Sequence, residues 1–199
     1  MAKSRDPDRA DRLNAVAEQQ GGYFSATQAC AAGYQSSQLA YHVCAGRYRR
    51  VRWGVYRLAQ FPTTPYEDLF AAWLEVGPHS IVSHDSALVV YDLSDVLPAA
   101  VHLIVPRGAS RRRRPGLRLH TNLLKPEDVT NVMGLPITTV ARTITDVAIG
   151  GLSEEMVSQA AREAVRRGLV SQEGLVRYAL ARRGRAWRIV GEALREPSA

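Results

Sequence analysis

The chain has few cysteines and no long apolar stretch. Cys30 and Cys44 are its two cysteines, too few for the disulfide framework of a small secreted domain, and their spacing matches no zinc motif. The sequence also has no signal-peptide pattern and no apolar run long enough to span a bilayer. We therefore expect a cytoplasmic protein without membrane contact, in which both cysteines are small buried residues on packed helices.

The common motifs of enzymes are missing as well. The sequence has no Gly-x-x-x-x-Gly-Lys phosphate loop, no Gly-x-Ser-x-Gly nucleophile elbow and no recognisable pair of catalytic carboxylates. His79 and His84 lie five residues apart with three aspartates downstream, but His79 precedes the predicted helix cap at Ser83, so no known metal-ligand spacing results. We expect His84 to cap and pack its helix, and we expect no catalytic residue, no metal and no cofactor.

Lysine is scarce, and charge is spread unevenly along the chain. Residues 1–60 carry nine basic and four acidic side chains, whereas residues 61–106 carry six acids and no lysine or arginine. A proline-bearing connector, Phe61–Pro65, lies at this change. A chain of 199 residues with 46% apolar content can hold two cores. We therefore expect one domain over residues 1–62 and a second over residues 63–199.

The segment from Gly22 to Leu58 is typical of a winged helix-turn-helix. Ser25 is placed to cap a short helix, with Gln28 at the capping-box position three residues later. Gly33 then breaks this helix into a tight turn. These signals predict the first helix of the motif.

A second helix and a hairpin are expected to follow. Ser36 is placed to cap this helix, Leu39 and Val43 lie four residues apart and point inward, and Gly46 ends it. The run from Tyr48 to Leu58 then predicts a strand pair that turns at a Trp-Gly dipeptide.

The outward side chains of this segment suit a DNA duplex. Short polar side chains fall on the face opposite Leu39 and Val43, and no acid lies between Glu18 and Glu67 to oppose phosphates. Arginines crowd the hairpin, as is expected of a wing that straddles phosphates. The expected DNA contacts are Ser36, Ser37, Gln38, Tyr41, His42, Arg47, Arg49, Arg50 and Arg52.

Two other interpretations of this segment stay open. Small helical pairs with a hairpin also serve as protein-interaction modules, and an arginine-rich hairpin can be a solvated edge that resists aggregation. We favour DNA binding because the polar helix face, the turn glycine and the basic wing agree with one another. Val51 and Tyr56 are expected in the hydrophobic core of the hairpin rather than at DNA.

Beyond residue 62 the pattern is that of a mixed α/β domain. Arg142 and Asp146 lie four residues apart in a predicted helix and are expected to form an ion pair rather than to catalyse. The fold class is therefore α+β: an N-terminal winged helix-turn-helix followed by a mixed α/β domain that ends in a helical C-terminal segment. The expected elements are helices over residues 66–76 and 83–91, strands over 101–105, 117–121, 130–133 and 135–138, and helices over 139–149, 153–167, 171–182 and 185–195.

One loop of the second domain is strongly basic. Seven basic residues and no acid lie from Arg107 to Lys125, with the run Arg111–Arg114 at the centre. Flanking glycine and proline indicate an exposed loop between two strands. The loop could extend the DNA footprint, or it could be solvated without a partner.

Several short motifs are similar to those of a known family. They are Gly22-Tyr23-Phe24-Ser25, Gln28-Ala29, Gly33, Gly46-Arg47-Tyr48-Arg49-Arg50-Val51 and Gly54-Val55-Tyr56-Arg57-Leu58, followed by Ser83-His84-Asp85-Ser86-Ala87, Gly134-Leu135-Pro136-Ile137-Thr138-Thr139 and Ala141-Arg142-Thr143 with Asp146. On these residues most of the chain resembles the AbiEi-type antitoxins of type IV toxin-antitoxin systems.

The resemblance implies a non-enzymatic bacterial regulator. Such antitoxins bind repeats in their own promoter through the winged helix and repress the operon, and their second domain counters a nucleotidyltransferase toxin. The expected partners are therefore double-stranded DNA and a cognate toxin, which the chain meets functionally or transiently. The outward face of the helix over 153–167 is the candidate for toxin neutralisation, through Arg162, Glu163, Arg166 and Arg167.

Two rival functions stay open. One is a plain winged-helix transcriptional regulator whose second domain binds a ligand or dimerises. The other is a nucleic-acid-processing enzyme that uses His84 and the nearby acids. A toxin gene next door favours the antitoxin, an enclosed pocket in the second domain favours the plain regulator, and a metal near His84 favours the enzyme.

Overall fold

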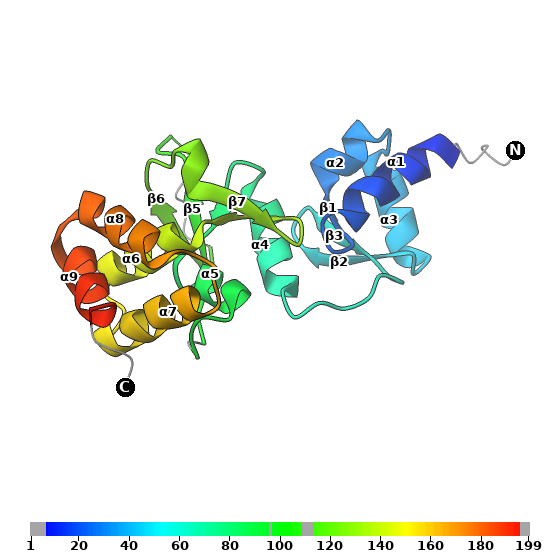
Figure 1. Cartoon of the computed structure of the whole chain (residues 1–199). Coiled ribbons are helices and arrows are strands. Elements are labelled where there is room, and N and C mark those ends of the chain that lie inside the picture. Colours follow the sequence, from blue (N-terminus) through cyan, green and yellow to red (C-terminus); the bar gives the residue numbers. More distant parts are fainter. Residues whose placement is uncertain (1–6, 96, 109–113, 196–199) are drawn as a thin grey trace, which may run out of the picture. The chain divides into compact units, whose positions relative to one another are not determined.

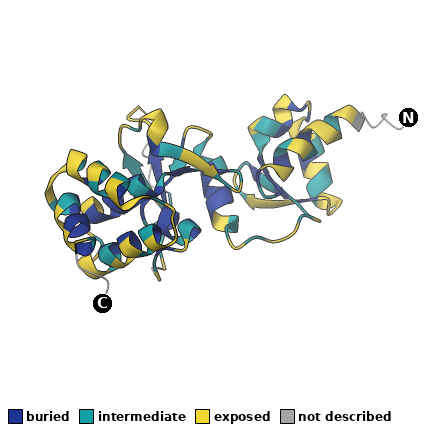
Figure 2. Ribbon diagram, in the orientation of Figure 1, coloured by how far each residue is buried: buried dark blue, intermediate teal, exposed yellow. Residues whose placement is uncertain are grey.

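A computed structural model describes residues 7–95, 97–108 and 114–195. Contacts between residues divide the chain into two compact units, which are described separately (Figure 1). The first comprises the chain up to Pro78 together with Met133–Leu135, and the second comprises His79–Val132 and the chain from Pro136 onwards. Each unit contains its own buried residues, which are dark blue on the ribbon in Figure 2.

The first unit has the element order of a winged helix-turn-helix. Its elements are α1 (Pro7–Glu18), β1 (Tyr23–Ser25), α2 (Ala26–Ala31), α3 (Ser36–Cys44), β2 (Tyr48–Arg52), β3 (Val55–Leu58) and α4 (Glu67–Val76). The strands form an antiparallel sheet in the order β1-β3-β2. The expected helix, turn, helix and hairpin are thus confirmed, and α1, which the sequence did not predict, precedes them.

The starts of α2 and α3 are capped in different ways. At α2, the Ser25 hydroxyl accepts a hydrogen bond from the Gln28 amide at 3.1 Å, and the Ser25 amide donates to Gln28 Oε1 at 2.8 Å. This is the expected capping box. At α3 the N-cap is Gln35 rather than Ser36, because the Gln38 side chain reaches back and accepts from the Gln35 amide at 2.9 Å. Ser36 is consequently the first residue inside α3.

The core of the first unit lies between its N-terminal helices and the sheet. Phe24 stacks on Tyr56 with ring centroids 5.7 Å apart, which confirms Tyr56 as a core residue. Val51 is 40% exposed, contrary to expectation, because it is the extra residue of a β-bulge between Arg50 and Arg52. The buried residues of this core are Leu13, Ala17, Phe24, Ala29, Ala32, Tyr34, Leu39 and Tyr48.

Both cysteines are exposed, so the prediction that they are buried is wrong. Helix α2 is six residues long and turns Ala29 inward. Cys30 therefore points away from the core, since successive residues are rotated by about 100° on a helix. Cys44 is the last residue of α3.

Helix α4 packs against the sheet of the first unit. Phe70 stacks on Tyr23 with ring centroids 5.7 Å apart, and both side chains are buried. Burying such a side chain stabilises a fold by about 1.5–3 kcal/mol. The contacts accordingly divide the chain after Pro78, beyond the expected boundary at residue 62. The division of function between residues 1–62 and 63–199 stays a prediction.

The second unit combines a mixed sheet with a group of helices. Its sheet has the order β6-β5-β4-β8-β7, in which β5 is parallel to β6 and antiparallel to β4. The elements are β4 (Ile81–Val82), α5 (His84–Tyr91), β5 (Val101–Val105), β6 (Leu117–Thr121), η1 (Pro126–Asp128), β7 (Val129–Val132), β8 (Leu135–Thr138), α6 (Val140–Gly150), α7 (Glu154–Arg166), α8 (Gln172–Arg182) and α9 (Gly184–Ala193).

Helices α5 to α9 share one apolar core, and Figure 1 shows α6 to α9 gathered together. Leu88, Ile144, Val157, Leu175 and Ile189 are among its buried residues. The expected α+β class with a helical C-terminal segment is thereby confirmed. In the part of the chain that the structure describes, no helix has both the length and the apolar character needed to cross a membrane.

Candidate functional site

Helix α3 presents a polar face. Leu39 is 4% exposed and anchors the helix in the core, whereas Tyr41 is 63% exposed. Ser36 and Ser37 are exposed in the first turn. The structure thus places these expected contact residues on the outer face of one helix. The N-terminal residues of a recognition helix are the ones that contact base edges.

Gln38 has a structural task at the start of the same helix. Its Oε1 accepts hydrogen bonds from the Gln35 amide and, at 3.2 Å, from the Arg9 guanidinium of α1. Arg9 also donates to the Gly33 carbonyl at 3.1 Å and lies 4.5 Å from the centre of the Tyr34 ring. Arg9 therefore brings a positive charge to the turn between α2 and α3. Sequence reasoning missed it, because its partners lie far along the chain.

His42 is half-buried in a cluster of aromatic rings. Its ring centroid lies 4.9 Å from that of Tyr48 and 5.6 Å from that of Tyr34. Its Nδ1 is 3.5 Å from an Arg47 guanidinium nitrogen. A groove of about 1300 Å³ in the first unit brings together five of the expected contacts, which line part of it: Ser37, Gln38, Tyr41, His42 and Arg47.

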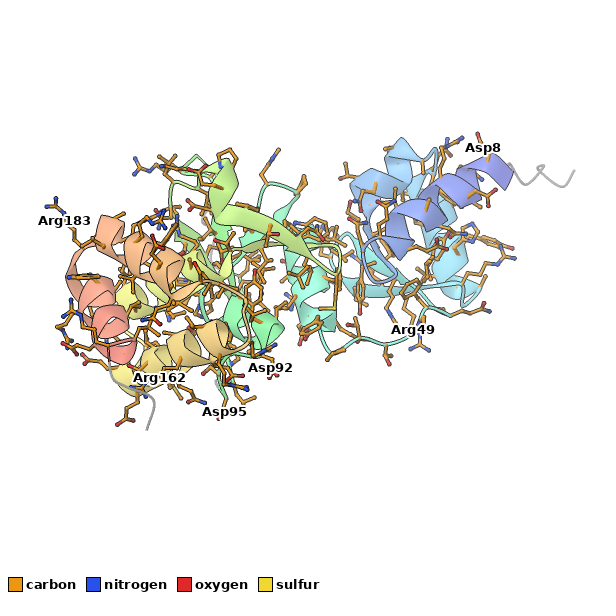
Figure 3. All side chains as sticks on the ribbon, viewed as in Figure 1. Asp8, Arg49, Asp92, Asp95, Arg162 and Arg183 are labelled. Carbon is orange, nitrogen blue, oxygen red and sulfur yellow. The ribbon has the colours of Figure 1, made fainter. Side chains whose placement is uncertain are left out.

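The wing carries exposed arginines beside an exposed aromatic ring. Arg49 and Arg50 lie on β2 and are exposed, and the Arg49 side chain projects away from its strand (Figure 3). The Arg50 guanidinium lies 4.6 Å from the centre of the Trp53 ring, and Trp53 is 85% exposed at the turn. This arrangement offers cations to phosphates and a flat apolar surface to a groove.

Two other arginines of the hairpin bind α4 instead. Arg52 lies 3.1 Å from a Glu75 carboxylate oxygen and 3.7 Å from Asp68. Arg57 is buried, donates to the Phe61 carbonyl at 2.6 Å and lies 3.8 Å from Glu67. The structure therefore places Arg52, an expected phosphate contact, in an intramolecular ion pair.

In the second unit, α7 buries a stripe of small apolar side chains. Val157, Ala160 and Ala164 are fully buried, which turns the charged residues outward. Arg162 is exposed, but its Nε donates to the Ala193 carbonyl of α9 at 3.0 Å. This candidate for toxin neutralisation therefore also joins two helices.

The other candidates on α7 differ in their contacts. Arg166 has a side chain 73% exposed and makes two hydrogen bonds to the Glu163 carboxylate, at 2.8 and 2.5 Å. Arg167 donates to the carbonyl groups of Tyr91 and Asp92 at 2.9 and 2.7 Å. Arg166 and Glu163 form the surface pair of this face, while Arg162 and Arg167 tie α7 to neighbouring segments.

Arg142 is fully buried and pairs with Asp146 at 2.7 Å, which confirms the expected ion pair. Asp128 binds the same guanidinium at 3.0 Å and accepts a hydrogen bond from the Tyr178 hydroxyl. Burial by itself would raise the pKa of Asp128, but the hydrogen bond from Tyr178 and the Arg142 charge hold it below its ordinary value. The network joins η1, α6 and α8 and is structural.

His84 begins α5 with a left-handed backbone, at φ +51°. Ser83 is the N-cap residue by position, and its hydroxyl contacts His84 Nδ1 at 3.0 Å. Two further histidines lie beside His84. Its ring centroid is 3.7 Å from that of His120 on β6 and 5.9 Å from that of His102 on β5.

Sequence reasoning singled out His84 and His79 and missed the two strand histidines. His79 is exposed. The parallel register pairs His102 with Arg118 and Ile104 with His120, so that both histidines face the same side of the sheet. The alternation of side chains along each strand was the signal that the sequence offered. The pairing of the two strands, which brings the histidines together, could not be known from the sequence.

Burial keeps this cluster of histidines neutral. It lowers the pKa of His84 to about 3, that of His120 to about 4 and that of His102 below its ordinary value. A hollow of about 330 Å³ opens beside the three rings, and its lining also includes Asp85, Arg118, Val147 and the chain at 150–152.

Of the basic loop, Arg111, Arg112 and Arg113 lie outside the described residues.

Helices α1 to α3 and the basic β2–β3 hairpin define a winged helix-turn-helix DNA-binding domain. Residues 11–59, from α1 through β3, match the model of a family described as the AbiEi antitoxin transcriptional regulator. This match confirms the resemblance found in the sequence over residues 11–59. The N-terminal unit therefore contains a winged-helix segment similar to that of this family of DNA-binding transcriptional regulators.

The RV2827C protein from Mycobacterium tuberculosis has a similar fold. Its crystal structure matches with a TM-score of 0.54 and 16% sequence identity, over 97% of this chain and 78% of that chain. At this identity the likeness concerns the fold alone. No curated protein matches the chain.

Proposed function

We propose that the protein represses its own toxin-antitoxin operon and that its second unit counters a nucleotidyltransferase toxin encoded beside it. The observation that carries the proposal is the AbiEi match over residues 11–59, in a unit whose outer surface is polar on α3 and basic on the wing. Regulators of this class read DNA with a helix and a wing. The family is one of regulators rather than enzymes.

The first unit would dock with the outer face of α3 in the major groove. Ser37 and Tyr41 are exposed there and would meet base edges, where hydrogen bonds and apolar contacts carry sequence information. Arg49 and Arg50 would contact the phosphates flanking the groove, and Trp53 would lie against the neighbouring minor groove. Gln38 would contact a base edge through its side-chain amide nitrogen, because its Oε1 already accepts two hydrogen bonds.

DNA recognition is tested by fluorescence anisotropy on the DNA upstream of the gene and on a shuffled duplex of equal length. At physiological salt we expect the upstream DNA to bind about 10³-fold more tightly or better. A reporter driven by that DNA should be repressed by the full chain. Equal affinity for the two duplexes would contradict autorepression.

Toxin neutralisation is tested by co-expression with the adjacent gene in a growth assay. The double variant Glu163→Arg, Arg166→Glu keeps an ion pair on α7 but inverts its charge pattern, so protection should be lost while DNA affinity is unchanged. The matched control is Glu173→Arg, Arg177→Glu on α8, where an exposed pair also lies 2.9 Å apart. Full protection by the α7 variant, or loss of it in both variants, would rule out this face.

A second candidate keeps DNA binding and makes the second unit a ligand sensor. It is favoured by the hollow of about 330 Å³ beside His84. Under this alternative, the chain would protect against no toxin, and a small molecule filling the hollow would change its DNA affinity. The growth assay therefore separates the two candidates.

A further inference from the structure

Three histidines converge in the second unit, and the proposed function gives them no role. His84 comes from the start of α5, His102 from β5 and His120 from β6. One imidazole nitrogen of each lies within 4.8 Å of those of the other two. His84 and His102 are 8% and 6% exposed, and His120 is half-buried. The cluster is therefore shielded from bulk water but lies at the edge of the hollow described above.

The hydrogen bonding of the cluster is incomplete. Within the described part of the chain, His102 Nδ1 and His120 Nε2 are buried without a hydrogen-bond partner. The contact between His84 Nδ1 and the Ser83 hydroxyl, at 3.0 Å, leaves Nε2 of that ring for a ligand. Buried polar atoms without partners are costly and rare in native proteins, and a bound ion can supply the missing partner.

The surroundings are those that metal-binding histidines require. Asp85 Oδ2 lies 3.9 Å from His102 Nε2, on the far side of the ring from the unpartnered Nδ1. A carboxylate behind a histidine orients the ring and raises its basicity as a ligand. This leaves His102 Nδ1, which has no hydrogen-bond partner, as the nitrogen available to a metal ion.

We propose that His84, His102 and His120 bind one divalent transition-metal ion of the zinc class, with the remaining coordination position facing the hollow. Imidazole nitrogen suits zinc, whereas calcium and magnesium prefer oxygen ligands. In a tetrahedral zinc site the ligand nitrogens lie about 3.3 Å apart. The 4.8 Å spread closes to this separation by side-chain rotation, which would unstack the His84 and His120 rings.

The open position would suit a water molecule or a small anion. Three protein ligands and one exchangeable position are the pattern of zinc sites that bind an external ligand. Arg118, the strand partner of His102, and Asp85 both line the same hollow. The Arg118 guanidinium could pair with an anionic ligand on the metal, while the Asp85 carboxylate offsets part of its charge.

The proposal is tested with the full chain, purified without an affinity tag and titrated with zinc chloride. We expect one equivalent of zinc per chain, and a higher unfolding temperature in its presence. His120→Ala should weaken binding at least about tenfold and abolish the thermal shift. His79→Ala, an exposed histidine outside the cluster, and Cys30→Ser with Cys44→Ser should bind as the wild type does. Absence of binding to the folded wild type would overturn the proposal, as would unchanged binding by His120→Ala.

A second variant keeps the test decisive if His120→Ala fails to fold. His120→Cys should still bind Co²⁺, and its near-ultraviolet absorption spectrum should gain a thiolate-to-metal charge-transfer band that the wild type lacks. Because Cys30 and Cys44 are exposed, this variant is made with both replaced by serine. Cobalt binding without that band would remove His120 from the coordination sphere and overturn the site. None of these readouts depends on DNA or on a toxin.

Discussion

Replacing Arg49 and Arg50 with alanine should weaken DNA binding in a salt-dependent way that replacing Arg52 does not reproduce. Arg49 and Arg50 are exposed on β2, so each is available to one phosphate. Arg52 already forms an ion pair, because its guanidinium lies 3.1 Å from a Glu75 carboxylate oxygen. Arg52 is therefore a matched control on the same hairpin: replacing Arg49 and Arg50 should change the salt dependence of DNA binding, and replacing Arg52 should not.

The magnitude follows from counterion release. Each phosphate contact contributes about 0.9 to the slope of log K against log salt, so the Arg49→Ala, Arg50→Ala variant should have a slope shallower by about 1.8. Between about 50 and 200 mM salt, one contact accounts for about a 3.5-fold loss of affinity and two for about 12-fold. The wild type should therefore lose about 12-fold more affinity than the double variant over this range.

The assay is fluorescence anisotropy on a labelled duplex at several salt concentrations. Arg52→Ala should keep the wild-type slope and lose about 0–1 kcal/mol of stability, as is usual for a partly exposed ion pair. An unchanged slope in the double variant would remove the wing from the phosphate interface. A slope that falls by about 0.9 in Arg52→Ala would show that Arg52 leaves Glu75 for DNA.

Three further predictions concern single features. Tyr41→Ala should cost about 1–3 kcal/mol on operator DNA and far less on random DNA, and equal losses in anisotropy titrations would exclude base reading by Tyr41. Arg142→Ala leaves the buried Asp146 carboxylate without its ion-pair partner and should lower the free energy of unfolding in urea by about 3–5 kcal/mol; a loss below about 1 kcal/mol would contradict a tightly coupled network. A fragment of residues 1–78 should unfold at a higher temperature than one of residues 1–62, which lacks the Phe70 stack on Tyr23, and equal temperatures would place α4 outside the domain.

The winged helix could be predicted because its signals are local. The Ser25 and Gln28 capping box, the turn at Gly33 and the helix stop at Gly46 each depend on residues within a few positions of one another. The same holds for the Arg142 and Asp146 pair on one helix. Helix α1 escaped prediction because its buried residues Leu13 and Ala17 form too narrow a stripe to give a periodic signal.

Features that depend on distant contacts could not be predicted. The attachment of α4 depends on the stacking of Phe70 on Tyr23, which no pattern within either segment indicates. The histidine cluster depends on strand pairing between β5 and β6 and on the place of α5 beside them. Among the expected DNA contacts, Arg52 was assigned from the charge of the hairpin alone, and its partner Glu75 lies on another element.

The pairing of the hairpin with α4 also determines how the protein approaches DNA. Glu67, Asp68 and Glu75 neutralise Arg52 and Arg57, so the long-range field of the wing comes from Arg47, Arg49 and Arg50. Arg47 and Arg49 lie at the α3 end of β2, and the Arg50 guanidinium lies over the Trp53 ring near the turn. Electrostatic steering acts before any contact forms. An incoming duplex is therefore drawn first to the exposed arginines at and beside β2, rather than to the arginines that α4 already neutralises.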